Sequence, residues 1–264
     1  FLVRELKNQI WETLARPARR LKTGTKIFFG GEKLAAEVLD KTADGHTIVG
    51  FQADGNFDEI LNEIGKTPLP PYIKRGDENA DADRERYQTI FAKERGAIAA
   101  PTAGLHFTPE IFQKIKHKGT AIAEITLHVG YGTFEPVRVS DLSEHRVASE
   151  RYEIRAETAK ILNGAKEKGS RIIAVGTTTT RALESAIAET GEFSAGKREA
   201  HLTITPGYKF KAVGGLLTNF HLPQSSLLVL VSAFAGYDLT MNVYKHAVES
   251  RYRFYSYGDC MLIV

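Results

Sequence analysis

The stretch LTNFHLPQSSLLVLVSAFAG, residues 217–236, decides the fold around it. Its second half, from Leu227 onward, is almost entirely apolar, which predicts an element buried in the protein interior. Its first half crowds Asn219, His221 and a helix-opening Gln-Ser-Ser around one proline. Polar groups placed where a buried element meets the surface are typical of small-molecule sites. We therefore expect this stretch to form one wall of a ligand site.

Composition limits the class of protein. The chain has 264 residues, 42% hydrophobic and 25% charged, which is enough for a sizeable core in one large domain or slightly more. Its single cysteine, Cys260, excludes an internal disulfide and a cysteine-rich metal cluster, so we expect a reducing, cytoplasmic location and no metal. The longest apolar run falls far short of the roughly 20 residues that span a bilayer, so no membrane role is expected. We expect a monomer, and we expect further sequence before Phe1.

Basic residues gather at the N-terminus. Residues 1–33 hold eight Lys and Arg against three acids, although the net charge of the whole chain is only +3. The segment ARPARRLKTGTK, residues 15–26, contains no acid at all. Such a stretch is typical either of a solvated surface or of a patch that faces phosphates. The candidate RNA-binding residues in it are Arg16, Arg19, Arg20 and Lys22.

Two regions differ in their periodicity. The first contains short β-like runs separated by Gly-Gly and Asp-Gly turns, KIFFG (26–30), LAAEVLD (34–40) and HTIVGFQ (46–52). A helix is predicted over 56–65, with Asn56 as N-cap and Gly65 as its stop. The proline-rich segment 67–75 cannot continue that helix, so we place a boundary there, between a β-rich module of residues 1–72 and a domain of residues 73–264. The acidic stretch 77–85 is expected to be a solvated loop.

Helices and strands alternate from Arg86 onward. Helices are predicted over 86–96, 108–119, 156–169 and 180–191, and strands over 121–130, 150–154 and 171–176. The expected fold class is therefore α/β, in the sense of mixed α+β. We expect a mixed sheet with flanking helices, together with the smaller N-terminal β-barrel-like module.

Two loops combine glycine with a histidine at the end of a predicted strand. In APTAGLHF (100–107), Gly104 permits close backbone approach and His106 titrates near neutrality. In LHVGYGTF (127–134), His128 precedes a G-x-G that lacks the third glycine of a dinucleotide-binding fingerprint. Each loop has a plainer explanation, a structural histidine in the first and a tight turn in the second.

Two further segments carry candidate binding groups. In IIAVGTTTTRALES (172–185), a strand runs into Gly176, four threonines and a helix, and the helix N-terminus is suited to a carboxylate, phosphate or ribose oxygen. Simple N-capping by one threonine is the alternative. In RYRFYSYGDCMLIV (251–264), arginines alternate with aromatic residues that could stack on bases or form a hairpin core. Because the sequence contains no zinc, P-loop or G-x-S-x-G motif, what remains is acid/base chemistry without a metal on a nucleoside-like ligand.

Seven motifs occur in the order of one known family. They are YQTIFA (87–92), AAPTAGLHFT (99–108), ITLHVGYGTFEPV (125–137), AVGTTTTRALES (174–185), ITPGYKF (204–210), LLTNFHLPQSSLLVLVSAFAG (216–236) and YRFYSYGDCMLI (252–263). The chain resembles, from about Phe57 to its C-terminus, the S-adenosylmethionine:tRNA ribosyltransferase-isomerases of queuosine biosynthesis. The basic segment WETLARPARRLKTG (11–24) also fits this family, whereas the family's own N-terminal segment is absent.

The resemblance implies a reaction and its partners. The ribosyl part of S-adenosylmethionine is transferred to 7-aminomethyl-7-deazaguanine (preQ1) at the wobble position of tRNA and isomerised, giving epoxyqueuosine and releasing adenine and methionine. No cofactor beyond S-adenosylmethionine as cosubstrate is implied. The sulfonium acidifies hydrogens on the adjacent ribose carbon, so a base must remove one and an acid must assist the departure of adenine.

The resemblance also implies site residues. The catalytic candidates, expected to converge on one pocket, are His106, His128, Glu150 and His221. The substrate-binding candidates are Thr102, Gly104, Gly130, Thr133, Gly176, Thr177, Thr178, Arg181, Asn219, Tyr257 and Asp259. The tRNA-binding candidates are Arg16, Arg19, Arg20, Lys22, Arg251 and Arg253.

One motif departs from the family. Its usual H-x-M-H-x-E pattern reads HRVASE here, with Val147 and Ala148 in place of methionine and the second histidine. A role for that histidine is therefore not transferable to this chain. Two alternatives stay open: a tRNA-binding module without catalysis, and a related transferase with an altered acceptor, which the unusual loop SAGKREAH (194–201) would also fit.

Overall fold

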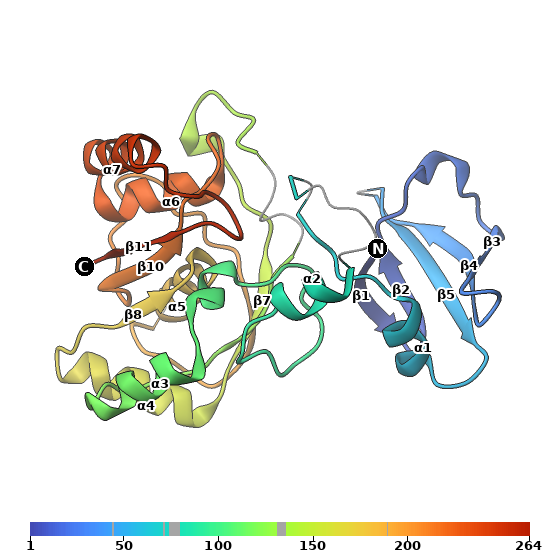
Figure 1. The fold of residues 1–264 in the computed structure, drawn as a ribbon, viewed down its shortest axis with the longest axis horizontal. Coiled ribbons are helices and arrows are strands. Elements are labelled where there is room, and N and C mark those ends of the chain that lie inside the picture. The colour runs from blue at the N-terminus through green and yellow to red at the C-terminus, as the bar shows by residue number, and fades with distance from the viewer. Residues whose placement is uncertain (44, 71, 74–79, 131–135, 189) are drawn as a thin grey trace. The chain divides into compact units, whose positions relative to one another are not determined.

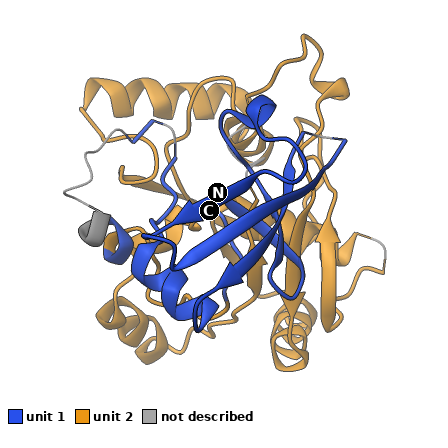
Figure 2. Cartoon of the chain, turned by 90° about the vertical axis from the view of Figure 1, so that its right-hand side faces the viewer, with its two compact units in different colours: residues 1–85, 95–98 blue, residues 86–94, 99–264 orange. Residues whose placement is uncertain are grey.

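The described residues of the chain divide into two compact units. The computed structural model describes residues 1–43, 45–70, 72–73, 80–130, 136–188 and 190–264 (Figure 1). By their internal contacts these form two compact units (Figure 2). Unit 1 comprises Phe1–Glu85 and Arg95–Ile98, and unit 2 comprises Arg86–Glu94 and Ala99–Val264. The domain boundary near residue 72 stays a prediction.

Unit 1 contains a five-stranded sheet. In spatial order its strands are β1 (Leu2–Lys7), β2 (Ile10–Thr13), β5 (Thr47–Ala53), β4 (Leu34–Lys41) and β3 (Lys26–Phe29). All neighbouring strands are antiparallel, and the three strands expected from periodicity are confirmed. Barrel-like closure of this sheet stays a prediction. On β4 and β5, alternate residues face inward, so Val38, Val49 and Phe51 form a core with Ile60 of the following helix.

The first helix follows its local signals. Helix α1 (Phe57–Ile64) begins at Asn56, whose side chain accepts hydrogen bonds from the amides of Asp58 and Glu59. It ends at Gly65, whose N–H donates to the carbonyl of Leu61 at 2.9 Å. The predicted helix over 56–65 is therefore confirmed, because capping depends on neighbours within a few residues.

The sequence prediction is wrong around residue 86. Helix α2 (Ala80–Arg86) includes residues 80–85 of the acidic stretch expected to be a loop, and the helix expected over 86–96 does not form. Long-range packing explains the second difference. A Cβ on Gly104 would lie 2.5 Å from the Phe91 ring and 2.8 Å from Thr89, so both side chains occupy the space that glycine leaves. Since Thr89 is 94% buried in this way, a regular helix gives way to turns.

The described residues of unit 2 form two three-stranded sheets in place of the single mixed sheet we expected. One has the order β11 (Cys260–Ile263), β10 (Gly215–Asn219) and β8 (Ile173–Val175); the other has the order β6 (Thr126–His128), β7 (Glu150–Ile154) and β9 (Gly196–Ala200). Strand β10 is parallel to β8 and antiparallel to β11, whereas the second sheet is antiparallel throughout. The fold is thus mixed α+β with several sheets.

The helices of unit 2 mostly match the predictions. They are α3 (Pro109–His117), α4 (Ala156–Glu167), α5 (Thr177–Ile187), α6 (Ser226–Ala235) and α7 (Tyr237–Glu249). Helix α3 is capped by Thr108 as predicted, while α5 begins three residues before the predicted start. Ala174 of β8 and four residues of α5 belong to the main core cluster: Ala182, Leu183, Ala186 and Ile187.

The apolar run after LTNFHLPQSS forms α6, with Ser225 as its N-cap. Leu230, Val231 and Ser232 are buried, whereas the other residues of this helix are partly exposed. No single helix in the described part of the chain is long and apolar enough to cross a membrane; α6 and α7 reach that length and composition only as a pair bent by 116°.

Candidate active site

Parallel pairing of β8 and β10 creates the edge on which the polar residues gather. Leu217 lies beside Val175, and the N–H of Gly176 donates to the carbonyl of Leu217 at 2.8 Å. Helix α5 starts directly after β8, and β10 ends at Asn219. In sheets with parallel strands, ligands bind outside the carboxyl ends of those strands. The opening motif and the threonine-rich motif therefore meet at one edge, although they are far apart in sequence.

Asn219 connects this edge to the loop that contains His106. Its Oδ1 accepts from Thr102 Oγ1 at 3.3 Å, and its Nδ2 donates to His106 Nε2 and to the carbonyl of Tyr255, both at 3.2 Å. Because an amide nitrogen only donates, His106 accepts at Nε2 in its neutral form. Burial lowers the pKa of His106, with Asp259 opposing and Arg253 reinforcing that shift. The structure thus brings Thr102, His106 and Asn219 together, and their roles in binding and catalysis stay predictions.

Glu150 and Arg181 form a buried ion pair. Glu150 Oε2 lies 3.2 Å from Arg181 Nη1, and their side chains are 9% and 8% exposed. The second carboxylate oxygen accepts a long hydrogen bond of 3.4 Å from the N–H of Gly130. Burial raises the pKa of Glu150, and the neighbouring Arg181 and Gly130 N–H only partly oppose it. Such a carboxyl is suited to proton transfer closer to neutrality than an ordinary glutamate.

The Arg181 guanidinium is also held by backbone carbonyls. Its Nη2 donates to Ala148 and, at 2.8 Å, to Ala200. Ala148 occupies the position of the family's second histidine, and its side chain is exposed. Its contact with Arg181 is made by the backbone carbonyl and does not depend on the side chain. Replacement of that histidine by alanine therefore leaves the buried ion pair intact.

A pocket opens beside this ion pair. Its cavity volume is about 20 Å³, which is room for about one water-sized group and far below the roughly 300–1,000 Å³ usual for small-molecule sites. Its lining residues are His145, Val147, Thr177, Thr178, Arg181, Ile204, Ser226, Leu227 and Leu230. Thr177, Thr178 and Arg181 were expected to bind substrate, and the structure brings all three to this one wall.

His145 is a residue of this pocket that the sequence reasoning missed. Its Nε2 lies 2.8 Å from Ser226 Oγ, and only 7% of the residue is exposed. Burial lowers its pKa, as does the nearby charge of Arg146, which favours a neutral imidazole. The sequence signal was available, since His145 is the histidine of the HRVASE motif that supplied Glu150.

The other two candidate histidines lie elsewhere. His221 Nε2 lies 2.8 Å from Oγ1 of Thr218, whose side chain is on the opposite face of β10 from that of Asn219. Burial lowers the pKa of His221 to about 4. His128 pairs with Arg151 in the sheet, so it shares the face of Arg151 and is opposite to that of Glu150. The four catalytic candidates are thus distributed over separate settings and do not share the pocket.

The remaining candidates have ordinary structural partners or exposed positions. Gly176 is the N-cap of α5 with φ +95°, which favours glycine. Tyr257 packs edge-on against Tyr87 with ring centroids 5.8 Å apart, and Asp259 pairs with Arg253 at 2.7 Å. Thr133 lies outside the described residues.

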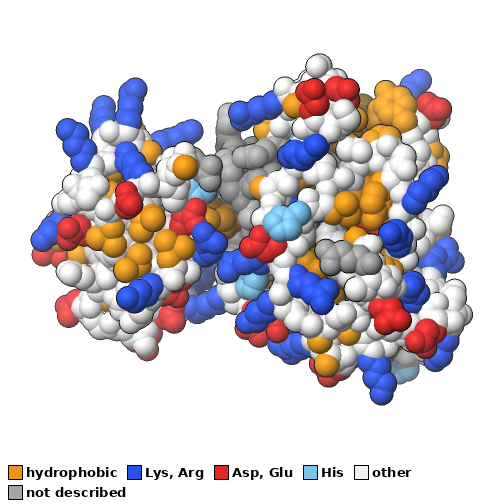
Figure 3. Space-filling model, turned by 180° about the vertical axis from the view of Figure 1, so that it is seen from behind, with side chains coloured by type: hydrophobic (Ala, Val, Ile, Leu, Met, Phe, Trp, Pro, Cys, Tyr) orange, Lys and Arg blue, Asp and Glu red, His pale blue; other side chains and the backbone are white. Residues whose placement is uncertain are grey.

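The candidate tRNA-binding residues are exposed. In unit 1, Arg19 and Arg20 lie in a short 3₁₀ turn, Ala18–Arg20, and Arg16 and Lys22 lie on either side of it. In unit 2, Arg251 is exposed, and Arg253 is exposed although it pairs with Asp259. Figure 3 shows Lys and Arg side chains spread over one face of each unit, with acidic side chains between them. This arrangement is compatible both with phosphate contacts and with a solvated surface.

Comparison with known proteins covers almost the whole chain. The family model described as "Queuosine biosynthesis protein" matches residues 1–263. The chain belongs to this queuosine biosynthesis family. The match includes unit 1, whereas the motif resemblance started at about Phe57, because short β-rich segments carry less distinctive motifs than the loops of unit 2.

Individual family members are similar over most of the chain. The S-adenosylmethionine:tRNA ribosyltransferase-isomerase of Natranaerobius thermophilus is 53% identical over 253 residues, 96% of this chain and 73% of that protein. The enzyme of the same name from Halothermothrix orenii is 49% identical over 263 residues, 100% of this chain and 76% of that protein. The crystal structure of the S-adenosylmethionine tRNA ribosyltransferase from Thermotoga maritima has 37% identity and a TM-score of 0.50, covering 100% of this chain and 73% of its own.

Proposed function

We propose that this chain is an S-adenosylmethionine:tRNA ribosyltransferase-isomerase. It transfers and isomerises the ribosyl moiety of S-adenosylmethionine onto 7-aminomethyl-7-deazaguanine at the tRNA wobble position, forming epoxyqueuosine and releasing adenine and methionine. The observation that carries the proposal is the 53% identity to an enzyme of that name over 96% of this chain. S-adenosylmethionine and tRNA are its substrates.

We assign the two proton transfers that this chemistry requires to Glu150 and His106, which lie in separate settings of unit 2. Glu150 has a pKa raised by burial, so it is suited to hold a proton and deliver it to the departing adenine. His106 is kept neutral by burial, which lowers its pKa, and is the candidate base; to accept a proton its Nε2 would have to release the hydrogen bond from Asn219 Nδ2. His221, with a pKa of about 4, is assigned a packing role with Thr218 and Tyr244.

The tRNA contacts are assigned to exposed basic residues. Arg16, Arg19, Arg20 and Lys22 of unit 1 and Arg251 and Arg253 of unit 2 would meet phosphates, because a polyanion binds clustered cations through release of counterions. Affinity for tRNA should accordingly fall with rising salt.

Adenine release tests the function directly. The protein is incubated with S-adenosylmethionine and a tRNA that carries 7-aminomethyl-7-deazaguanine, and adenine is quantified by chromatography. The matched control is the same tRNA with guanine at the wobble position. We expect adenine and a modified nucleoside only with the first tRNA. Binding of tRNA without adenine release would favour the module without catalysis, and turnover on another acceptor would favour the altered transferase.

A further inference from the structure

The sheet of unit 1 has an exposed aromatic ring at its edge. Strand β3 is an edge strand of this sheet, and Phe28 on it pairs with Ala35 of β4. The preceding residue, Ile27, packs against the core that contains Ile60 of α1. Because successive residues of a strand point to opposite faces, Phe28 lies on the outer face, and it is 57% exposed. An exposed aromatic ring on an edge strand favours association with another molecule.

The outer face beside Phe28 is made partly of small and apolar residues. A Cβ on Gly50 of β5 would lie 3.2 Å from Leu39 Cδ1, so the Leu39 side chain lies over this glycine on the outer face. Leu39 is 40% exposed, and Ala35 lies directly opposite Phe28. Figure 3 shows hydrophobic side chains exposed on unit 1 next to Lys and Arg side chains. The small side chains of Ala35 and Gly50 leave room for a planar ring to approach the sheet closely.

Basic residues surround this edge of the sheet. Residues 16–41 hold seven Lys and Arg against three acids. Lys26 lies on the same face as Phe28, about 7 Å along β3, opposite Glu37 of β4. Four cations in and beside the 3₁₀ turn are exposed and form no ion pair with a described residue: Arg16, Arg19, Arg20 and Lys22. Their charges are therefore available to an anionic partner.

The basic turn adjoins the edge that carries Phe28. Lys41 at the end of β4 donates through Nζ to the carbonyl of Ala18 in the turn at 2.9 Å. The N–H of Gly24 donates to the carbonyl of Val38 at 2.8 Å, so the chain leaving the turn is already hydrogen-bonded to β4 before β3 begins. The unpaired cations and the exposed ring thus belong to one continuous surface of unit 1.

We propose that the outer face of β3 and β4 binds unpaired bases of RNA, with Phe28 as the stacking platform and the basic turn as the contact to neighbouring phosphates. Single-stranded RNA supplies a planar base and a phosphate in every nucleotide, which matches a ring beside unpaired cations. A protein partner would have to supply an acid for each of those cations. The inference rests on the proposed function, whose substrate is a tRNA, and adds a surface for bases to the phosphate contacts.

Two RNA probes test the platform. Fluorescence anisotropy measures binding of the whole chain to a labelled hairpin with the anticodon stem and loop of the substrate tRNA, and to a blunt duplex of the stem alone. Phe28→Ala should weaken binding of the hairpin by roughly 5- to 100-fold and leave binding of the duplex almost unchanged. Phe28→Trp should retain the affinity for the hairpin, because indole also stacks on bases. Leu6→Ala is the matched control, since Leu6 is 45% exposed on β1, the opposite edge strand.

The salt dependence separates stacking from phosphate contacts. Phe28→Ala should leave the slope of log binding constant against log salt concentration as in the parent, because stacking releases no counterions. Arg20→Gln should reduce the magnitude of that slope by about 1 and weaken binding of both probes alike.

Each outcome decides the proposal. Phe28→Ala with the hairpin affinity of the parent, or with equal losses for hairpin and duplex, overturns the platform, and thermal unfolding shows whether each variant is folded. Self-association of the parent that Phe28→Ala abolishes, with unchanged hairpin affinity, also overturns it and assigns the surface to a second copy of the chain; sedimentation velocity measures this.

Adenine release by the parent separates the platform from the proposed function. Adenine release together with unchanged hairpin binding by Phe28→Ala contradicts only the platform. The expected loss of hairpin binding without adenine release by the parent contradicts only the proposed function, and a parent that neither binds the hairpin nor releases adenine contradicts both.

Discussion

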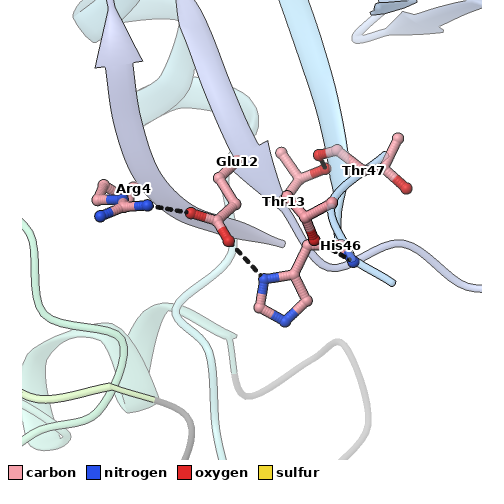
Figure 4. A network of polar contacts seen from close by, with 6 residues as sticks. Arg4, Glu12, Thr13, His46 and Thr47 are labelled. Atoms are coloured by element: carbon pink, nitrogen blue, oxygen red, sulfur yellow. Dashed lines mark hydrogen bonds and ion pairs between the residues drawn. The ribbon is translucent and has the colours of Figure 1, made fainter. Parts of the chain in front are cut away.

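Two Arg–Glu ion pairs of this protein differ in solvent exposure and in the direction of the pKa shift of the glutamate. In unit 1, Arg4 and His46 lie on either side of the Glu12 carboxylate (Figure 4). One carboxylate oxygen accepts a hydrogen bond from Arg4 at 2.9 Å, and the other lies 2.7 Å from His46 Nδ1. In unit 2, Glu150 meets Arg181 at 3.2 Å. The Arg4 side chain is 47% exposed, whereas that of Arg181 is 8% exposed.

The pKa values of the two carboxyls shift in opposite directions. Burial raises the pKa of Glu12, but hydrogen bonds from His46 and Arg4 outweigh burial, and the pKa lies below its ordinary value. For Glu150 burial wins, because Arg181 and one long hydrogen bond compensate it only in part. Solvent access and the number of donors therefore distinguish a structural carboxylate from one suited to proton transfer.

The largest expected difference between the two pairs is the change in turnover when the carboxyl of each pair is removed. We expect Glu150→Gln to lower adenine release by roughly 10² to 10⁴, because amide nitrogen and oxygen cannot replace a proton-transferring carboxyl. Glu12→Gln should leave turnover close to that of the parent. Single-turnover measurements with saturating substrates check both, and equal losses in the two variants would remove Glu150 from the proposed chemistry.

Removing the arginine of each pair should lower the free energy of unfolding by different amounts. Arg181→Met leaves Glu150 buried without its cation, which should cost about 3–5 kcal/mol in the free energy of unfolding. Arg4→Met should cost no more than about 1 kcal/mol, since that pair is largely solvated and Glu12 retains His46. Urea denaturation of both variants provides the measurement. A similar cost for the two would show that burial does not distinguish the pairs.

The stability contributions of the two glutamates should have opposite pH slopes. Glu12 has a folded pKa below 4.5, so its contribution is full above the unfolded pKa and is lost as the pH falls through the folded pKa. Glu150 has a folded pKa above 4.5, so its contribution is full below the unfolded pKa and is lost as the pH rises through the folded pKa.

Urea denaturation at several pH values tests these slopes. The stability difference between the parent and Glu12→Gln should move against the parent on acidification, and the difference between the parent and Glu150→Gln should move in its favour. Only the pH dependence of each stability difference is compared, since its magnitude also includes the effect of the arginine that loses its carboxylate partner in the Gln variant. Slopes of the same sign would contradict the assignment.

The smallest expected effect concerns a buried polar atom in each region. Thr47 in unit 1 is fully buried, and its Oγ1 has no hydrogen-bond partner among the described residues, as is true of Arg181 Nε in unit 2. Thr47→Val keeps the shape and removes the unpaired hydroxyl, so it should stabilise the protein by about 1 kcal/mol without affecting turnover. A lower urea midpoint would show that the hydroxyl has a partner in solution.

Local signals in the sequence were reliable where neighbours determine the outcome. Asn56 and Thr108 cap the helices they were expected to cap, because an N-cap bonds amides two or three residues away. The sequence also singled out His106, Asn219, Thr177 and Arg181 because each belongs to a long polar motif, and the roles expected for them stay predictions. The helix expected over 86–96 failed for the opposite reason, since Phe91 and Thr89 pack against the distant Gly104.

The sequence by itself determined the family motifs, the N-caps of α1 and α3, and the inventory of acid, base and donor groups. Only the tertiary structure decided which of those groups meet. It brought Thr102 to Asn219 across 117 positions, placed His145 against Ser226 across 81, and put His128 on the face opposite Glu150. It also gave Glu12 and Glu150 opposite pKa shifts. The physical reason is that burial and hydrogen-bond partners depend on segments far apart in the chain, whereas capping and periodicity depend on adjacent residues.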